Sequence, residues 1–253
     1  MRIGGIDIGS RYIKHVVLDG SQLAETYKVE TGYDPLAQCQ ELIDATRPDA
    51  LVATGYGRHL IANGGGIPTV TEIKAAARGA RALFPTCRTI IDIGGQDTKV
   101  IHVNNEGSVM TFEMNDRCAA GTGKFLEMMA RALGFEIDNF GASCENNGYQ
   151  QAPVTINNLC AVFAESEVIS LISKGIRREA IAVALHRSIA SRVASLAKRV
   201  GVRQDVVFTG GCARNPSLKA MLGERLGQDL LVAPNPDILT AWGAALCAEQ
   251  SPP

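Results

Sequence analysis

The chain begins with a run of alternating apolar residues that a polar turn interrupts. Residues 3–18 are rich in isoleucine and valine and break at Gly9 and Ser10, a pattern typical of two strands joined by a tight turn. The same pattern returns over residues 89–103. We therefore predict two β-hairpins at these positions.

Apolar residues elsewhere recur with strand or helix spacing. Short strands are expected at 24–29, 50–53, 109–114 and 206–208. Residues 135–157 look irregular, and the next helix would be capped by Asn157 or Asn158. Strands mixed with helices predict an α/β fold. The helices are expected at 35–46, 71–83, 122–133 (ended by Gly134), 160–175, 177–200, 215–226 and 238–249.

The two hairpins match residue by residue. Asp92 follows Asp7 by 85 residues, and at the same offset Lys99 matches Lys14. A chance likeness of two hairpins is the alternative, but the Asp, the Gly and the Lys all keep their spacing. The repeat predicts a duplicated fold with a cleft between its halves.

Both turns carry the chemistry that nucleotide phosphates need. Glycines let backbone N–H groups approach an anion closely, and carboxylates hold Mg²⁺ through water. The first turn offers Asp7, Gly9, Ser10 and Lys14; the second offers Asp92, Gly94, Gly95, Gln96 and Asp97. We expect Asp7 and Asp92 to hold Mg²⁺ through water, and Gln96 and Asp97 to position water or the metal.

Two further loops contain paired glycines. Gly210 and Gly211 follow a buried strand and suit the adenosine end of a nucleotide, although a plain strand-to-helix turn is the alternative. The segment 121–124 (Gly-Thr-Gly-Lys) lacks the spacing of a P-loop. It still fits a phosphate-side loop at a helix N-terminus.

Composition narrows the classes of partner. The formal net charge is −1, which gives no sign of a broad cationic surface for nucleic acid or for an anionic membrane. No apolar run reaches the length that spans a bilayer, and the N-terminus has no signal-peptide core, so a cytoplasmic protein is expected. Seven cysteines, an odd number, argue against a disulfide framework.

The hairpins and the late Gly-Gly loop together resemble the acetate kinase, sugar kinase, heat-shock protein and actin superfamily. More narrowly, the chain resembles the BadF/BadG/BcrA/BcrD-type ATPases, which include the activators of 2-hydroxyacyl-CoA dehydratases and the ATPase subunits of benzoyl-CoA reductase. Arg11 departs from that pattern, where a small hydroxyl residue is usual, and so does Asp237, where a glutamine is expected near the adenine. The resemblance lies in residues 53–58, 91–103, 115–123, 160–168 and 186–200.

The resemblance implies a duplicated, actin-like (ribonuclease H-like) fold of two lobes. Residues 1–87 with 238–253 would form lobe I, and residues 88–237 would form lobe II. It also implies ATP as the nucleotide. The expected cofactor-binding residues are Gly9, Ser10, Arg11, Tyr12, Ile13, Lys14, Gly94, Gly95, Gly121, Thr122, Gly123, Lys124, Gly210, Gly211, Ala213, Asn215 and Asp237.

Cys118 and Cys160 each precede a predicted helix, whose N-terminal dipole stabilises a thiolate. A [4Fe–4S] cluster takes four thiolates, and the resemblance implies one cluster shared by the two chains of a homodimer. Two buried core cysteines, a zinc site, or a cluster within one chain that includes Cys144 are the alternatives. Cys39 and Cys247 are expected in the core, Cys87 and Cys144 in loops, and Cys212 in the adenosine loop.

The resemblance implies an ATPase that drives electron transfer. A ferredoxin or flavodoxin would reduce the cluster, and the electron would pass to a partner acyl-CoA dehydratase or reductase. A small-molecule (sugar) kinase of the same superfamily is the second hypothesis, although it leaves Cys118 and Cys160 without a role. A non-enzymatic nucleotide-binding scaffold is the third.

Overall fold

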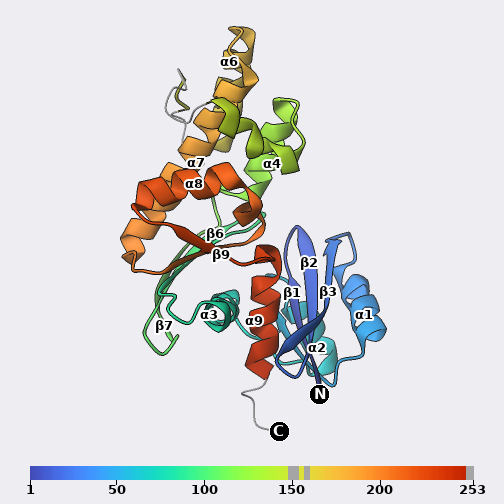
Figure 1. Ribbon diagram of the computed structural model, residues 1–253. Helices are drawn as coiled ribbons and strands as arrows, with labels where there is room; N and C mark the ends of the chain where they lie inside the picture. Colours follow the sequence, from blue (N-terminus) through green and yellow to red (C-terminus); the bar gives the residue numbers. More distant parts are fainter. Residues whose placement is uncertain (148–153, 157–159, 249–253) are drawn as a thin grey trace.

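The computed structural model describes residues 1–147, 154–156 and 160–248. Two β-sheets lie one on each side of a central pair of helices, and α6 projects from the end of the molecule opposite the two termini (Figure 1). Asn157 and Asn158, expected as a helix cap, lie outside the described residues. No helix in the described part of the chain is long and apolar enough to cross a membrane.

The first sheet has the strand order β3-β2-β1-β4, and β1 pairs antiparallel with β2 and parallel with β4. Its inner isoleucines pack against Cys39 and Leu42 of α1 on one face, and α9 covers the other. Helix α1 begins at Pro35 because the Asp34 side chain accepts a hydrogen bond from the Ala37 N–H. The elements are β1 (Arg2–Ile8), β2 (Tyr12–Asp19), β3 (Gln22–Glu30), α1 (Pro35–Thr46), β4 (Ala50–Thr54) and α2 (His59–Gly65).

The second sheet has the order β7-β6-β5-β8-β9 and repeats the pairing of the first, because β5 is antiparallel to β6 and parallel to β8. Helix α7 packs on one face and α3 on the other. The elements are α3 (Glu72–Leu83), β5 (Thr89–Ile93), β6 (Thr98–Val103), β7 (Val109–Asn115), α7 (Arg178–Val200), β8 (Val206–Thr209), α8 (Pro216–Leu226) and β9 (Leu230–Val232).

Helices α3 and α9 pack against each other between the two sheets. The chain thus returns at its C-terminal end to the sheet with which it began. Helix α9 spans Leu239–Ala248. The remaining elements lie around the second sheet and its top: η1 (Ala119–Gly121), α4 (Gly123–Ala132), α5 (Ile137–Phe140), η2 (Ala142–Asn147), α6 (Ala161–Ser173), η4 (Gly211–Arg214) and η5 (Pro236–Ile238).

The predicted α/β class, both hairpins and the expected helices in the described residues are confirmed, with shifts of one or a few residues at their ends. Two elements were missed. Helix α2 is short and glycine-rich, and β9 has three residues, so neither shows a full period of its pattern. The expectation that residues 135–147 are irregular was wrong, since α5 and η2 lie there.

Candidate functional site

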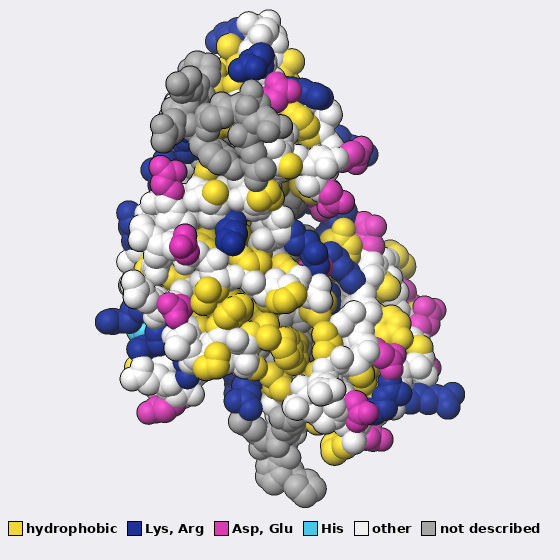
Figure 2. Space-filling model, viewed as in Figure 1, with side chains coloured by type: hydrophobic (Ala, Val, Ile, Leu, Met, Phe, Trp, Pro, Cys, Tyr) yellow, Lys and Arg dark blue, Asp and Glu magenta, His cyan; other side chains and the backbone are white. Residues whose placement is uncertain are grey.

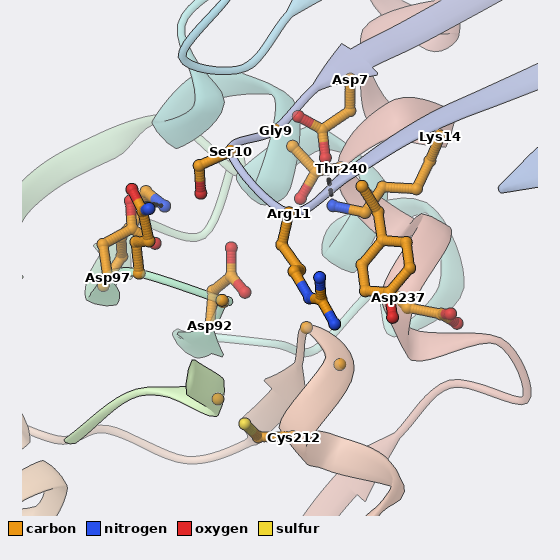
Figure 3. A pocket seen from close by; sticks show the side chains of 18 of the residues that line it. Asp7, Gly9, Ser10, Arg11, Lys14, Asp92, Asp97, Cys212, Asp237 and Thr240 are labelled. Atoms are coloured by element: carbon orange, nitrogen blue, oxygen red, sulfur yellow. Dashed lines mark hydrogen bonds and ion pairs between the residues drawn. The ribbon is translucent and has the colours of Figure 1, made fainter. Parts of the chain in front are cut away.

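A cavity of about 680 Å³ opens between the two sheets, at the ends of both hairpins. Figure 2 shows the surface hollowed between the part that carries α8 and the part that carries β2 and β3, with Lys and Arg side chains gathered at the hollow. The turns of both hairpins, the η4 loop and the first residues of α9 meet there (Figure 3). The cavity therefore gathers the three loops that the sequence marked as nucleotide-binding.

The first turn is closed by a hydrogen bond from the Gly9 N–H to the Tyr12 carbonyl, at 3.1 Å. Asp7 is the second-last residue of β1, and its carboxylate accepts a hydrogen bond from the Lys14 ammonium at 2.9 Å (Figure 3). Burial lowers the pKa of Lys14, but the charge and hydrogen bond of Asp7 together with the charge of Asp92 raise it, and the net shift is upward. The charge of Asp7 is therefore balanced by a lysine within its own hairpin.

The second turn is closed in the same way, from the Gly94 N–H to the Asp97 carbonyl at 2.9 Å. Its lysine is arranged differently, because Lys99 forms ion pairs with Asp97 at 2.7 Å and with Glu72 of α3 at 3.0 Å. Burial raises the pKa of Asp92 to about 6, although the Lys99 charge opposes the rise. Asp92 thus titrates close to neutral pH at the wall of the cavity.

The duplication extends beyond the hairpins to the next parallel strand. Thr54 at the end of β4 lies beside Asp7, and Thr209 at the end of β8 lies beside Asp92. A glycine follows each threonine, with φ of 92° at Gly55 and 82° at Gly210. A Cβ at Gly210 would lie 2.4 Å from an Asp92 carboxylate oxygen, and one at Gly55 would lie 2.5 Å from an Asp7 oxygen. Only glycine fits these positions, and the repeated Thr-Gly was a signal that the sequence interpretation missed.

The far end of the cavity is built by η4 and η5. The Asn215 carboxamide accepts a hydrogen bond from the Leu218 N–H at 2.9 Å, which caps α8, and its nitrogen lies 2.9 Å from the buried His186 Nε2. Burial lowers the pKa of His186 to about 4. Its ring is therefore neutral, and Nε2 accepts the hydrogen bond from Asn215.

A carboxylate sits at the same end. Asp237 pairs with Lys28 of β3 at 2.8 Å and with Arg214 of η4 at 2.7 Å. Burial raises the pKa of Asp237, but the hydrogen bonds from Lys28 and Arg214 outweigh it and give a net lowering. The ion pair with Lys28 ties the first sheet to the loops of the second.

The structure brings most of the expected residues together. Ile13, Gly121, Thr122, Lys124 and Ala213 do not line the cavity; Ile13, for example, alternates inward into the core of the first sheet. Unexpected lining residues include Lys28, Glu72, Glu127 and Thr240, which come from segments without a recognisable local motif, and Arg214, which belongs to the expected adenosine loop but was not assigned to the site. The expected residues that do line it are Asp7, Gly9, Ser10, Arg11, Tyr12, Lys14, Asp92, Gly94, Gly95, Gln96, Asp97, Gly123, Gly210, Gly211, Asn215 and Asp237.

Cys118 and Cys160 lie outside the cavity wall. Cys160 is exposed and stands at the N-cap position of α6. Cys118 is half-buried and precedes the three-residue η1, and α4 begins at Gly123 behind Thr122, within one residue of the expected start. Helix α6 contacts η1. The two cysteine-bearing segments are thus neighbours.

The other cysteines are buried to different degrees. Cys39 is fully buried and Cys247 half-buried, both on helices as expected. Cys87 lies in a loop but is buried. Cys144 was expected in a loop, but it is buried in η2, with its sulfur 3.5 Å from Nδ1 of His186. Cys212 is buried in η4 at the wall of the cavity.

Distant solved structures share the fold. A glucokinase of the ROK family from Streptomyces griseus, solved with glucose and AMPPNP, superposes with a TM-score of 0.60 at 15% sequence identity, over 99% of this chain and 100% of that chain. Identity that low shows the fold alone, so the sugar-kinase hypothesis is not favoured. The duplicated, actin-like ATPase architecture is confirmed.

Close relatives are more specific. The activator of lactoyl-CoA dehydratase from Anaerotignum propionicum is 43% identical over 98% of this chain and 97% of its own length. The (R)-2-hydroxyglutaryl-CoA dehydratase activating ATPase of Acidaminococcus fermentans is 41% identical over 96% of this chain and 95% of its own length. The solved activator of the 2-hydroxyisocaproyl-CoA dehydratase from Clostridium difficile, with bound ADPNP, has a TM-score of 0.89 and 38% identity over 98% of this chain and 94% of that chain. The model of the BadF/BadG/BcrA/BcrD ATPase family matches residues 5–248, and the chain belongs to that family of ATPases.

Proposed function

We propose that this chain is an ATP-driven electron-transfer activator, which binds ATP in the cleft and passes a low-potential electron to a partner enzyme. The observation that carries the proposal is a direct hydrogen-bonded connection between the second phosphate turn and the segment that follows Cys118. The Gly123 N–H donates to the Gly94 carbonyl and the Lys124 N–H to the Gly95 carbonyl, both at 2.9 Å. A movement of the second phosphate turn would therefore be transmitted through these hydrogen bonds to the segment that follows Cys118.

The two turns would hold the phosphates of ATP. Both turns and Lys14 line the space between the sheets, and the N–H groups that do not close the turns would bind the phosphates together with the Lys14 ammonium. Asp7 and Asp92 are the two carboxylates that would hold Mg²⁺ through water, and the bound metal would neutralise phosphate charge. Asp92, with its raised pKa, is the better proton acceptor for an attacking water that Gln96 and Asp97 orient.

The adenosine would lie at the far end, against Gly210 and Gly211 of the η4 loop. Asn215 and Asp237 present polar groups there, and both are fixed by partners that do not depend on the nucleotide. Gly121, Thr122, Lys124 and Ala213 would act through the backbone and packing of the same loops, since their side chains do not line the cavity.

Cys118 and Cys160 fit an iron–sulfur cluster shared between two copies of the chain. Each precedes a helical segment, and the two segments are in contact. Two thiolates are half the number that a [4Fe–4S] cluster takes, so we propose that a second copy supplies the other two across a two-fold axis. Phe163 and Ile169 of α6 are 63% and 57% exposed, and an apolar helix surface of this kind favours a protein partner. When bound, the cluster would carry one electron.

The lobes would be residues 1–87 with 238–253 and residues 88–237, and closure of the cleft between them would move the segments that follow Cys118 and Cys160. A reduced ferredoxin or flavodoxin would supply the electron, and ATP hydrolysis to ADP and phosphate would accompany its passage. The three activators described above are named for dehydratases of 2-hydroxyacyl-CoA substrates, so we propose that class of partner rather than a benzoyl-CoA reductase. The cytoplasm, where thiols stay reduced, is the proposed location.

Anaerobic reconstitution with iron and sulfide tests the proposal. We expect one [4Fe–4S] cluster per dimer, an EPR signal after reduction with dithionite, and loss of both in Cys118→Ala and Cys160→Ala. Cys247→Ala, which removes a half-buried cysteine on α9, is the matched control and should retain the cluster. A cluster that survives both substitutions, or a full cluster in a monomer, would contradict the proposal.

A further inference from the structure

Arg11 lies between the two phosphate turns. It belongs to the first turn, and its position there corresponds to that of Gln96 in the second, because both turns close between equivalent residues. A Cβ added to Gly95 would lie 2.9 Å from the Arg11 Cβ, so the arginine side chain starts against the opposite turn. Its guanidinium projects into the cavity, between Asp92 and Asp237 (Figure 3).

Two carboxylates hold this guanidinium. Its Nε lies 3.3 Å from Glu127 of α4, and its Nη1 pairs with Glu30 at the end of β3. Glu127 belongs to the second half of the molecule and Glu30 to the first. The pair between Arg11 and Glu127 therefore spans the cleft, directly beside the space between the two turns.

The pair is suited to exchange. The Arg11 side chain is 34% exposed and that of Glu127 is 27% exposed, so neither charge is locked in a dry interior. Glu127 has a second cation within reach, the Lys124 ammonium at 3.5 Å, one turn earlier on α4. If an anion enters the cavity, Arg11 and Glu127 can separate and each still has a partner. Glu127 then pairs with Lys124, and Arg11 pairs with the anion.

A terminal phosphate is such an anion. Guanidinium binds phosphate in a two-pronged geometry, and the charge of a phosphate exceeds that of one carboxylate. On the proposed function, the phosphates of ATP lie along the two turns that Arg11 separates. ADP lacks the outermost phosphate and would leave the pair with Glu127 in place.

We propose that Arg11 distinguishes ATP from ADP by exchanging Glu127 for the terminal phosphate. This inference rests on the proposed function, since it needs a nucleotide in the cleft. The exchange would free α4 from the first half of the molecule when ATP is bound. Because the start of α4 is bonded to Gly94 and Gly95, the release would act on the same segment that leads back to Cys118.

Equilibrium binding of ADP and of the β,γ-imido analogue of ATP, measured with Mg²⁺ on the full chain by calorimetry, tests the exchange. Arg11→Gln gives the first turn the residue of the second. We expect it to weaken binding of the ATP analogue by about 10-fold or more, the loss of one charged hydrogen bond, and to change ADP binding by less than about 2-fold. Arg11→Lys should restore part of the preference.

Glu127→Gln should act in the opposite direction, because it removes the competitor for the guanidinium. We expect tighter binding of the ATP analogue with ADP binding unchanged. Glu113→Gln, which breaks the surface pair with Arg199, is the matched control and should alter neither. If Arg11→Gln weakened the binding of both nucleotides equally, or of neither, the role of Arg11 would be overturned but the proposed function would not. A wild-type chain that binds neither nucleotide would overturn the proposed function as well.

Discussion

The two β-hairpins have the same backbone and different electrostatics. In both, an aspartate one residue before the end of the first strand faces a lysine across the ladder, Asp7 opposite Lys14 and Asp92 opposite Lys99. Both turns close with the same hydrogen bond. What differs is the partner of the lysine, which is the aspartate itself in the first hairpin and a pair of other carboxylates in the second.

This difference shows what duplication conserves and what it leaves open to change. The backbone of the turn is the same twice, together with the glycine beside each aspartate. The charge around the aspartate is set by residues of other elements, such as Glu72 of α3. One carboxylate therefore forms an ion pair with the lysine of its own hairpin, while burial raises the pKa of the other to about 6. The first suits a fixed charge and the second suits proton transfer.

The largest predicted effect is on folding, in Lys99→Met. Lys99 is 5% exposed and faces three carboxylates, of which it pairs with Asp97 and Glu72. Its loss leaves like charges together in the interior, and we expect the free energy of unfolding to fall by about 3–5 kcal/mol. Lys14→Met, which removes a lysine paired with a single carboxylate, should cost about half as much. Urea denaturation of both variants measures the difference, and a greater loss in Lys14→Met would reverse the comparison.

Asp92→Asn should have the next largest effect. The amide cannot accept a proton, so we expect kcat for ATP hydrolysis to fall by about 100-fold or more. Asp7→Asn removes the charge that pairs with Lys14, and should reduce kcat by about 10-fold while weakening the response to Mg²⁺. A steady-state phosphate-release assay across Mg²⁺ concentrations separates the two. Equal losses of kcat in the two variants would show that Asp7 and Asp92 have the same role in ATP hydrolysis.

The parts of this site that could be predicted from the sequence are those that a local motif carries. Asp7 and Asp92 are readable because a strand, an aspartate and a glycine follow one another, and the lysines because they keep the same spacing. No local motif marks Glu72, Glu127 or Lys28 in the sequence. Each reaches the cavity from a different helix or strand, so only the folded structure shows that it lines the site.

Distance along the chain explains the rest. Lys28 and Asp237 are 209 residues apart, and only the packed fold brings them to 2.8 Å. The electrostatic asymmetry could not be predicted for the same reason, because it depends on Glu72 reaching Lys99 from α3. Ile13 was assigned to the site by its place in the turn motif, but strand alternation turns its side chain into the core.

The hairpins also differ at His15, which is buried in β2, where the corresponding residue of β6 is Val100. Burial lowers the pKa of His15 to about 4, below its value of 6.5 in the unfolded chain. Only the unfolded state then binds a proton between these values, so stability is lost as the pH falls from 6.5 towards 4. We expect His15 to account for a loss of about 2 kcal/mol between pH 7 and pH 5.

His15→Gln removes this titration and keeps a neutral polar side chain of similar size. Denaturation at pH 7 and pH 5 should show a smaller acid loss in the variant, with a remainder from His186, whose pKa is also lowered to about 4. The loss of unfolding free energy between pH 7 and pH 5 is measured within each protein, so a general destabilisation by the substitution does not affect the result. An equal loss in both proteins would show that His15 does not cause the acid sensitivity.

The smallest predicted effect concerns the threonines beside the two aspartates. The Thr209 hydroxyl donates to the Pro236 carbonyl at 2.7 Å, whereas the buried Thr54 hydroxyl has no hydrogen-bond partner among the described residues. Valine has the same shape without the hydroxyl, so Thr209→Val should lower the free energy of unfolding by about 1 kcal/mol, the loss of one of the two hydrogen bonds that the Pro236 carbonyl accepts; the Gly210 N–H donates the other, at 3.2 Å. Thr54→Val should change it by less than about 0.5 kcal/mol or raise it, since it removes a buried polar group that makes no bond. Parallel denaturation curves test this, and because the Pro236 carbonyl belongs to the loop that positions Asp237, nucleotide binding should also weaken in Thr209→Val alone. An equal fall in the free energy of unfolding in the two variants would mean that both threonine hydroxyls contribute alike to stability. The asymmetry of the two halves would then be confined to the charges around Asp7 and Asp92.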